Sequence, residues 1–331
     1  MSVRVPITIA CWDYDRTQAL ADGRIRPEGV DLTYLALPVE ETFFRMARYQ
    51  EFDAAEMSLS SYVLSLSGND SPFVAIPIFP SRAFRHNGIY VRAQSPLREL
   101  SELAGKTVGI PEYQVTAAVW IRGILAEFHQ VPVESVRYRT GGLQQSGRVE
   151  KIQLSLPAGV DVEPVPADQT LTDLLLSGEL DAIYSPRTPQ SMLDGDISIR
   201  RLLADPRAAE EEYFTRTGIF PIMHVIVLRR DLYQSHRWLA RSLFQAFVDA
   251  KHNVQQKLGE TAANRYMLPW LYAAVEQTQS VMGRDFWPYG LKANDTTLRT
   301  FLRYSYEQGL AGRLFEPAEL FAPESLQAYR I

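Results

Sequence analysis

Residues 103–129 read LAGKTVGIPEYQVTAAVWIRGILAEFH. The short apolar run at residues 107–110 predicts a β-strand. After a polar loop, apolar residues recur at 117, 120, 121, 124, 125 and 128, which is the spacing of one face of an α-helix from about 116 to 129. A strand that leads directly into an amphipathic helix is a βα unit, and this unit predicts an α/β protein with a largely parallel sheet.

The same alternation of short apolar runs and helical patterns extends in both directions from this stretch. Before it, the pattern predicts strands near residues 5–11, 30–35, 52–57, 73–78 and 88–92, with helices near 40–48 and 60–67. After it, the pattern predicts a strand at 136–139, a strand that ends at 183 or 184, and a strand at 219–228, with helices near 171–177 and 237–258.

The length of the chain, 331 residues, exceeds the size at which a single hydrophobic core stops growing, so we expect two lobes. Residues 1–90 are predicted to begin the first lobe and residues 91–221 to form an inserted second lobe. Residues 222–331 are predicted to complete the first lobe with carboxyl-terminal helices. Two crossings between the lobes imply a hinge.

Composition excludes several classes of function. A net charge of −5, from 39 acidic and 34 basic residues without a basic block, argues against a nucleic-acid partner. No stretch approaches the roughly 20 apolar residues that a membrane-spanning helix needs. Cys11 is the only cysteine in the sequence, so no internal disulfide can form, and we expect it in a buried strand. The first apolar run is too short for a secretory signal, which predicts a cytoplasmic protein.

Six stretches of the sequence resemble one known family. They are FDAAEMSLSSY (52–62), FPSRAFRHNGIYV (79–91), LAGKTVGIPEYQVTAAVWIRGIL (103–125), SGELDAIYSPR (177–187), TGIFPIMHVIVLRRD (217–231) and MGRDFWPYGL (282–291). The sequence resembles the 4,5-dihydroxyphthalate decarboxylase family, relatives of the substrate-binding proteins of transporters. The resemblance implies a two-lobed type II periplasmic-binding-protein-like fold with a ligand cleft between the lobes. It also implies non-oxidative decarboxylation of a hydroxylated aromatic carboxylate, namely 4,5-dihydroxyphthalate to protocatechuate.

Three arginines follow predicted strands at the positions where open α/β sheets bind ligands, beyond the carboxyl ends of the strands. They are Arg82, Arg85 and Arg187. An arginine offers a carboxylate two parallel hydrogen bonds, so we predict that these three bind the substrate carboxylates. The alternative for each is a solvated residue or a salt bridge between the lobes.

Other polar residues lie in the same loops or at helix entries. Thr116 stands where a hydroxyl N-cap is expected, and a helix amino terminus attracts an anion; a plain cap is the alternative. Ser58 and Ser60 have the same two interpretations. Arg122 points away from Thr116 around the helix, so a structural ion pair is its alternative. The residues predicted to contact the catechol hydroxyls are Asp13, Tyr184 and Tyr289.

Aromatic decarboxylation needs an acid that protonates the ring carbon bearing the leaving carboxylate, and a base or acceptor at a ring hydroxyl. We predict His224 as the acid, because it is a polar residue in the apolar returning strand and lies in the TGIFPIMH motif. We predict Glu56 as the base, with His86 in reserve for either role. The alternatives are a buried structural histidine at 224 and, at 56, a helix-entry carboxylate that pairs with an arginine.

The sequence lacks the HExxH, CxxC, P-loop, GxSxG and GxGxxG motifs, so nothing demands an organic cofactor; no metal-binding residue is predicted, and assistance by a divalent metal is left open. The expected partner is a small aromatic carboxylate, and a homo-oligomer is left open. Two other functions compete with the decarboxylase. One is a non-enzymatic solute-binding protein for an aromatic dicarboxylate, and the other is a different lyase or hydrolase on the same scaffold.

Overall fold

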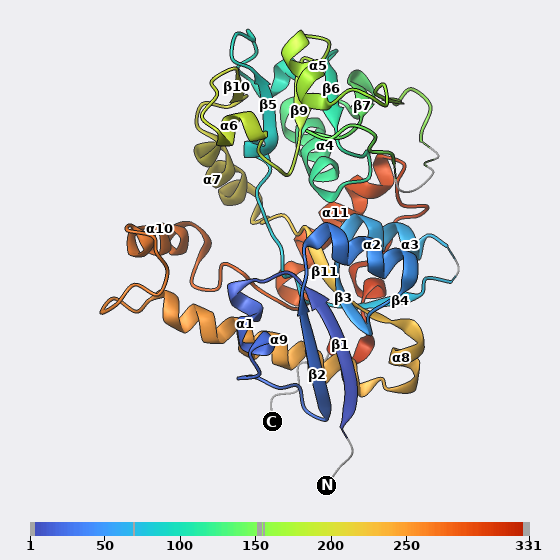
Figure 1. The fold of residues 1–331 in the computed structure, drawn as a ribbon, viewed down its shortest axis with the longest axis vertical. Helices are drawn as coiled ribbons and strands as arrows, with labels where there is room; N and C mark the ends of the chain where they lie inside the picture. The colour runs from blue at the N-terminus through green and yellow to red at the C-terminus, as the bar shows by residue number, and fades with distance from the viewer. Residues whose placement is uncertain (1–3, 69, 151–153, 155, 327–331) are drawn as a thin grey trace. The chain divides into compact units, whose positions relative to one another are not determined.

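The computed structural model describes residues 4–68, 70–150, 154 and 156–326. The chain forms two compact units (Figure 1). Unit 1 comprises Met1–Arg82, Thr217–Arg299 and Phe315–Ile331, and unit 2 comprises Ala83–Arg216 and Thr300–Leu314. The predicted lobe boundaries, at 90/91 and 221/222, lie several residues downstream of these divisions.

Unit 1 is built on a mixed five-stranded sheet in the order β2-β1-β3-β11-β4. The strand β1 pairs in parallel with β2 and β3, whereas β11 is antiparallel to both β3 and β4. The returning strand is therefore an interior strand of the sheet, flanked on both sides by strands from the first part of the chain. The bounds are β1 Val5–Cys11, β2 Val30–Ala36, β3 Ala54–Ser58, β4 Phe73–Ile76 and β11 His224–Arg229.

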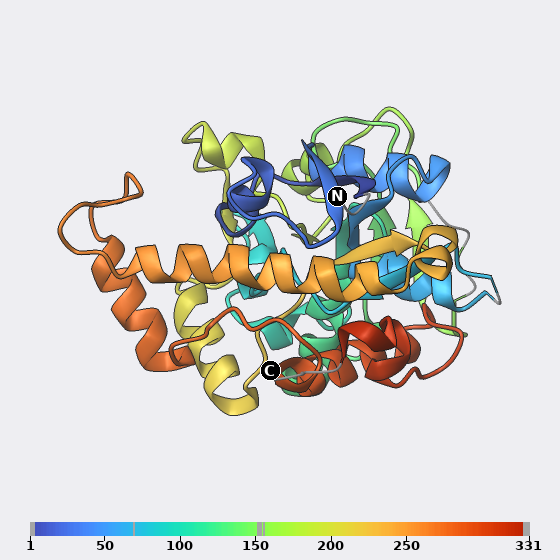
Figure 2. The same ribbon diagram turned by 90° about the horizontal axis from the view of Figure 1, so that it is seen from below.

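The core of unit 1 lies between this sheet and the long helix α9 (Trp238–Leu258). Buried Leu239, Leu243 and Phe247 recur along one face of the helix and belong to the same apolar cluster as Ile7 and Ile9 of β1. Figure 2 shows α9 in orange, with α10 set at an angle to it. The other helices assigned wholly to unit 1 are α1 Gln18–Ala21, α2 Val39–Tyr49, α3 Leu59–Leu66, α8 Arg230–Ser235 and α10 Leu271–Met282.

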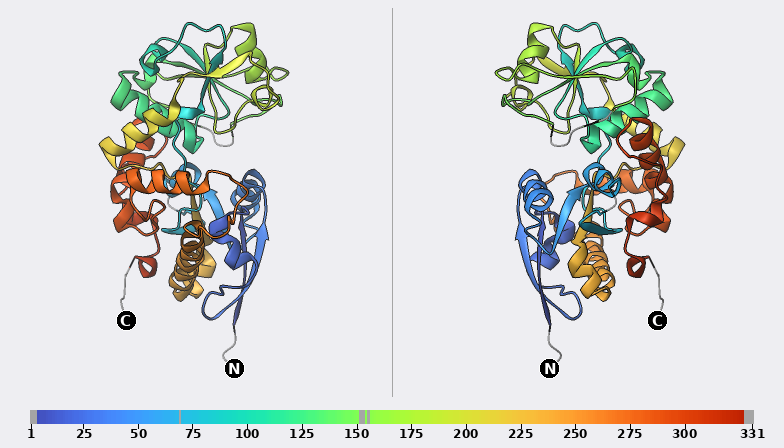
Figure 3. Two further views of the ribbon diagram at one scale, coloured as in Figure 1. Left: turned by 90° about the vertical axis from the view of Figure 1, so that its left-hand side faces the viewer. Right: turned by 90° about the vertical axis from the view of Figure 1, so that its right-hand side faces the viewer.

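Unit 2 is built on a twisted six-stranded sheet in the order β10-β5-β9-β6-β7-β8 (Figure 3). The strands β9, β6, β7 and β8 run parallel to their neighbours in this order, and β5 and β10 add antiparallel pairs at one side. The strands are β5 Ile89–Arg92, β6 Thr107–Ile110, β7 Arg137–Thr140, β8 Asp161–Pro164, β9 Ala182–Tyr184 and β10 Ile199–Arg201. The helices are α4 Thr116–His129, α5 Leu171–Ser177, α6 Gln190–Leu193 and α7 Pro206–Thr217.

The helix α11 (Asp295–Glu307) is divided between the units, which differs from the predicted assignment of all residues after 222 to the first lobe. Trp120 of α4 lies 5.5 Å from the ring of Phe301 and 5.7 Å from that of Tyr304, between centroids. Gln308 donates to the carbonyl of Val119. Residues 300–314 join unit 2 because α4 needs these aromatic side chains to cover its apolar surface.

The observed elements follow the predicted ones closely in most places. The strands at 5–11 and 107–110 and the helices at 116–129 and 171–177 have the predicted bounds. The strand predicted at 219–228 begins too early, because β11 starts at His224. No helix among the described residues has the length and apolar character that crossing a membrane requires.

Candidate active site

Two side chains that the sequence predicts for catalysis, His224 and Glu56, meet on one face of the unit 1 sheet. The antiparallel register of β11 and β3 places His224 opposite Ser58 and Ile226 opposite Glu56. His224 and Glu56 are therefore diagonal neighbours two residues apart in register, within reach of long side chains. The Nδ1 atom of His224 lies 2.6 Å from Oε1 of Glu56.

The Glu56 carboxylate is fully buried and receives hydrogen bonds on both oxygens. Oε1 accepts from the Tyr14 hydroxyl at 2.7 Å as well as facing His224, and Oε2 accepts from the Trp12 backbone N–H at 3.0 Å and from the Cys11 thiol at 3.4 Å. Burial raises the pKa of Glu56, but the charge of His224 and these hydrogen bonds outweigh it. The pKa of Glu56 therefore lies below its usual value of 4.5.

His224 is partly exposed, with 17% of its side chain accessible. The edge of the Phe43 ring packs against its imidazole at 4.8 Å between centroids. Because an ionised Glu56 accepts hydrogen bonds, Nδ1 of His224 is the nitrogen that carries the shared proton, and Nε2 is the nitrogen available for chemistry. A partly exposed imidazole oriented by a buried carboxylate is suited to proton transfer.

Tyr14 and Cys11 complete this site and had no predicted role in it. Cys11 ends β1 level with Glu56, since Ala10 pairs with Ala55, and it is buried and free as expected. Burial and the charge of Glu56 raise the pKa values of the Tyr14 hydroxyl and the Cys11 thiol, so both groups remain protonated donors. The position of Tyr14 after the first strand was visible in the sequence, but its contact with Glu56 depends on the register of two strands.

Arg82 in unit 1 is engaged by the protein itself, so the contacts do not favour its predicted role as a carboxylate ligand. Its guanidinium is buried and donates to the carbonyls of Phe220 and Pro288, both at 2.9 Å, and to the side chain of Asn294. Burial lowers the pKa of Arg82 to about 9. These bonds join three segments of unit 1 that are distant in sequence, which is a structural role.

The other predicted residues of unit 1 are distributed around the sheet. Ser58 caps α3, as its alternative interpretation held, with its hydroxyl accepting from the Ser61 N–H at 3.4 Å. Ser60 is buried in the first turn of α3. Asp13 is exposed on the loop after β1, and the Tyr289 hydroxyl is buried with no partner among the described residues.

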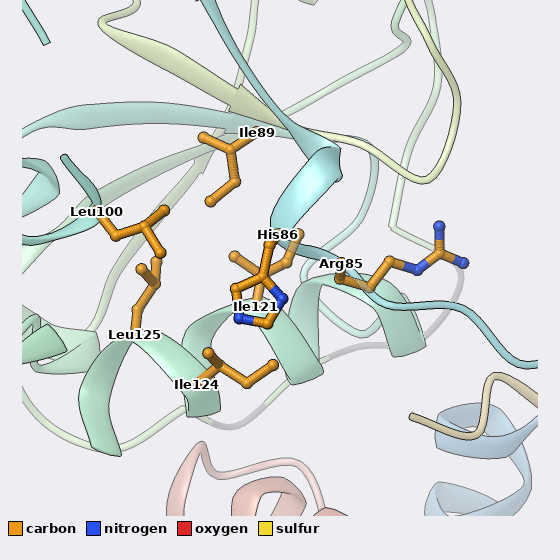
Figure 4. Close-up of a pocket in the computed structure, with 7 residues that line it drawn as sticks. All are labelled: Arg85, His86, Ile89, Leu100, Ile121, Ile124 and Leu125. Atoms are coloured by element: carbon orange, nitrogen blue, oxygen red, sulfur yellow. The ribbon is translucent and has the colours of Figure 1, made fainter. Parts of the chain in front are cut away.

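In unit 2, Arg85 and His86 lie just before β5, in different surroundings. The His86 ring is inserted among Ile89, Leu100 and Leu125, and the Arg85 guanidinium points away from this cluster (Figure 4). Burial, followed by the charge of His129, lowers the pKa of His86 to about 4, so the imidazole is neutral near pH 7. Burial lowers the pKa of Arg85 to about 10, and the guanidinium stays charged.

The remaining predicted residues belong to unit 2 as well. Thr116 is the first residue of α4 and not its N-cap, which is Val115, so its alternative interpretation as a plain cap is wrong and its contact with the substrate stays a prediction. Arg122 is buried and donates to Gln308 and to the Tyr113 carbonyl, an internal contact of unit 2. The Tyr184 hydroxyl is buried without a partner among the described residues, and Arg187 is exposed. Since Arg85 and Arg187 lie in unit 2 and Arg82 in unit 1, the predicted convergence of the three stays a prediction.

Residues 4–68, 70–150, 154 and 156–326 contain no group of three or more His, Cys, Asp or Glu side chains arranged to hold a metal ion. The polar groups of the candidate site are one imidazole, one carboxylate, a phenol and a thiol. These groups hydrogen-bond to one another, and groups of these kinds can transfer protons.

Comparison with solved structures shows the fold class of the chain. The chain has the fold of periplasmic binding proteins: it superposes on the aliphatic sulphonate binding protein SsuA from Escherichia coli with a TM-score of 0.55 at 11% identity, over 96% of this chain and 97% of that one. No family model matches the sequence.

Two curated relatives then identify the family. A 4,5-dihydroxyphthalate decarboxylase from Comamonas testosteroni is 38% identical over 328 residues, 99% of each chain. A protein of the same name from Pseudomonas putida is 41% identical over 211 residues, 64% of this chain and 82% of that protein. The chain belongs to the 4,5-dihydroxyphthalate decarboxylase family, and both the family and the fold class predicted from the sequence are confirmed.

Proposed function

We propose that this protein is a carboxy-lyase that converts 4,5-dihydroxyphthalate to protocatechuate and CO₂, with His224 as the proton donor. The observation that carries the proposal is the 2.6 Å contact between the buried Glu56 carboxylate and the partly exposed His224 imidazole. The names of the two relatives support the choice of substrate.

The reaction balances with one proton. The ring hydroxyl para to the leaving carboxylate donates electrons as its O–H proton is drawn toward an acceptor, and the ring carbon that bears the carboxylate takes a proton from His224. The carbon–carbon bond to the carboxylate then breaks, CO₂ departs, the bonding electron pair restores the aromatic ring, and the ring oxygen takes its proton back from the acceptor. The net change replaces one carboxylate by one hydrogen.

Glu56 is better suited to positioning His224 than to the predicted role of base. Four donors already occupy its two oxygens, and the carboxylate is fully buried. Its negative charge stabilises the imidazolium from which the proton leaves, and its hydrogen bond fixes the ring orientation. We assign the acceptor for the ring hydroxyl to Asp13, an exposed carboxylate on the loop that carries Trp12 and Tyr14.

We further propose that the reaction uses no cofactor. No electron leaves or enters the substrate in the balanced scheme, since the para hydroxyl supplies and recovers the electron pair. Exhaustive dialysis against a chelator should leave turnover unchanged, and recovery of lost activity by an added divalent cation would contradict this part of the proposal.

The direct test is incubation of the purified protein with a panel of hydroxylated phthalates while CO₂ release is measured. We expect release from 4,5-dihydroxyphthalate with formation of protocatechuate. Tight binding of the same compound without turnover would favour a solute-binding protein instead. The cytoplasmic location and any homo-oligomer stay predictions, which cell fractionation and solution molecular mass would test.

A further inference from the structure

Arg16 is linked to the His224–Glu56 pair through the Tyr14 side chain, although the sequence analysis gave it no role. It belongs to the short helix η1 (Asp15–Thr17), which follows β1. Its guanidinium carbon is 4.0 Å from the centroid of the Tyr14 ring, and the hydroxyl of that ring donates to Glu56. A cation is thus stacked on the aromatic side chain that contacts the buried carboxylate.

A second aromatic ring also contacts the Arg16 guanidinium. The Trp287 ring centroid is 4.3 Å from its central carbon. Trp287 is itself held in place, because its indole N–H donates to the Phe79 carbonyl at 2.9 Å and the Phe220 ring packs at right angles to it at 5.3 Å. Aromatic faces orient a guanidinium without using its N–H groups.

The hydrogen bonds of Arg16 leave part of its donor capacity available. Nε donates to the Pro80 carbonyl at 2.6 Å, and Nη1 donates to Asp15 at 3.1 Å. A guanidinium has five N–H groups, and within the described part of the chain these two bonds leave N–H groups on both Nη atoms. The side chain is also 17% exposed, in contrast to Arg82, which is buried with three internal acceptors.

We propose that Arg16 binds the carboxylate that the substrate keeps. This inference rests on the proposed decarboxylation. The leaving carboxylate must lose its charge as it becomes CO₂, so a salt bridge to it would stabilise the ground state and oppose the reaction. The neighbouring carboxylate stays charged throughout, and a rigid guanidinium bound to it holds the ring in one orientation beside His224. Arg16 therefore selects rings with a carboxylate adjacent to the one that leaves.

The experiment compares Arg16→Met and Arg16→Lys with the parent protein. For each, KM for 4,5-dihydroxyphthalate is measured, with the inhibition constants of protocatechuate, which has the retained carboxylate, and catechol, which lacks it. In Arg16→Met we expect KM and the protocatechuate constant to rise about 30-fold or more, while the catechol constant stays within about twofold. For Arg16→Lys we expect values of KM and of the protocatechuate constant between those of the parent protein and Arg16→Met, because a lysine supplies charge without a planar pair of donors. Arg24→Met is the matched control, since Arg24 is an exposed arginine of the same unit paired with Asp22.

Several results overturn the inference. If protocatechuate and catechol lose affinity equally, Arg16 only supports the Tyr14 and Trp287 rings. Unchanged KM and inhibition constants in Arg16→Met also exclude a role for Arg16 in binding the carboxylate. If Arg16→Met fails to fold, then KM and inhibition constants equal to those of the parent protein in a folded Arg16→Lys exclude that role. Absence of CO₂ release by the parent protein refutes the proposed function separately. Calorimetric binding of phthalate to the parent and the variants still tests Arg16 in that case.

Discussion

The Nδ1 atom of His224 lies 2.6 Å from Oε1 of Glu56, although 168 residues separate them in sequence. The contact arises because β11 returns to pair antiparallel with β3, which brings the start of one strand beside the end of the other. A one-residue slip of this register would turn either side chain to the opposite face of the sheet.

His224→Gln tests the proton-transfer role. Because a positioned general acid typically contributes about 10²- to 10⁴-fold in rate, we expect kcat to fall by that range with KM nearly unchanged. The melting temperature should stay close to that of the parent protein, since the ring is partly exposed. Normal turnover in a destabilised variant would indicate a purely structural histidine, so kcat and melting temperature are measured on one preparation.

Glu56→Gln tests the charge of the buried carboxylate. The pKa of Glu56 is lower in the folded protein than its usual value of 4.5. The ionised carboxylate therefore stabilises the folded protein above pH 4.5. This stabilisation is lost as the pH falls through the pKa of the folded state. The free energy of unfolding of the parent protein should therefore exceed that of the variant most at neutral pH. Chemical denaturation from pH 7 to 3 should show the difference shrinking, and a constant difference would contradict the assignment.

His86→Leu tests the buried neutral imidazole of unit 2. The pKa of His86 is about 4 in the folded protein, against a usual value of 6.5. As the pH falls from 6.5 to 4, the imidazole is protonated in the unfolded chain but not in the folded protein, so the folded protein loses stability over this range. The leucine variant should show a shallower decline of melting temperature over this range. His252→Gln, which changes an exposed histidine, serves as the control and should keep the parent slope. Equal slopes in all three proteins would refute the prediction.

Arg82→Met separates a structural arginine from a substrate ligand. Loss of the guanidinium removes a charged donor from the Phe220 and Pro288 carbonyls, of which Pro288 keeps the Asn294 amide, so we expect a decrease of about 1 to 3 kcal/mol in the free energy of unfolding. KM of the folded fraction should stay within about twofold of the parent value. A large rise in KM with unchanged stability would restore the role predicted from the sequence.

Gly123→Ala tests the packing of residues 300–314 on α4. A Cβ at position 123 would lie 2.1 Å from the Tyr304 ring, a distance that forces the two helices or the ring to move. Overpacking of this kind costs about 1 to 3 kcal/mol, which thermal or urea unfolding would detect. Gly259→Ala is the control, because nothing lies within 4 Å of its Cβ position, and it should be nearly neutral.

Local pattern was sufficient for the elements whose apolar spacing is unambiguous. The helix Thr116–His129 was predicted with its observed bounds because its apolar face repeats over three turns. The start of β11 was predicted wrongly, because residues 219–223 are as apolar as the strand itself. The apolar pattern alone does not show where pairing with the neighbouring strands begins. The fold class was predictable because the stretches that resemble the family are spread from residue 52 to residue 291.

The site was predictable only in part, because contacts between distant strands depend on register. His224 and Glu56 were identified from their positions, but the four donors around Glu56 include a backbone N–H and a thiol that no motif marks. Arg82 and Arg16 illustrate the same limit. Both arginines follow strands of unit 1, and only the structure shows that Arg82 is buried with three internal acceptors while Arg16 is partly exposed with donors on both Nη atoms.

The interior position of β11 also sets an order of events during synthesis of the chain. The strands β3 and β4 leave the ribosome before β11 exists, so each has an unpaired edge until the whole of residues 83–216 has been translated. Unit 2 in turn waits for residues 300–314 to cover Trp120. Neither unit is complete until the last part of the chain has emerged, so a premature stop before residue 300 removes material from both units and leaves two partial folds with exposed apolar surface.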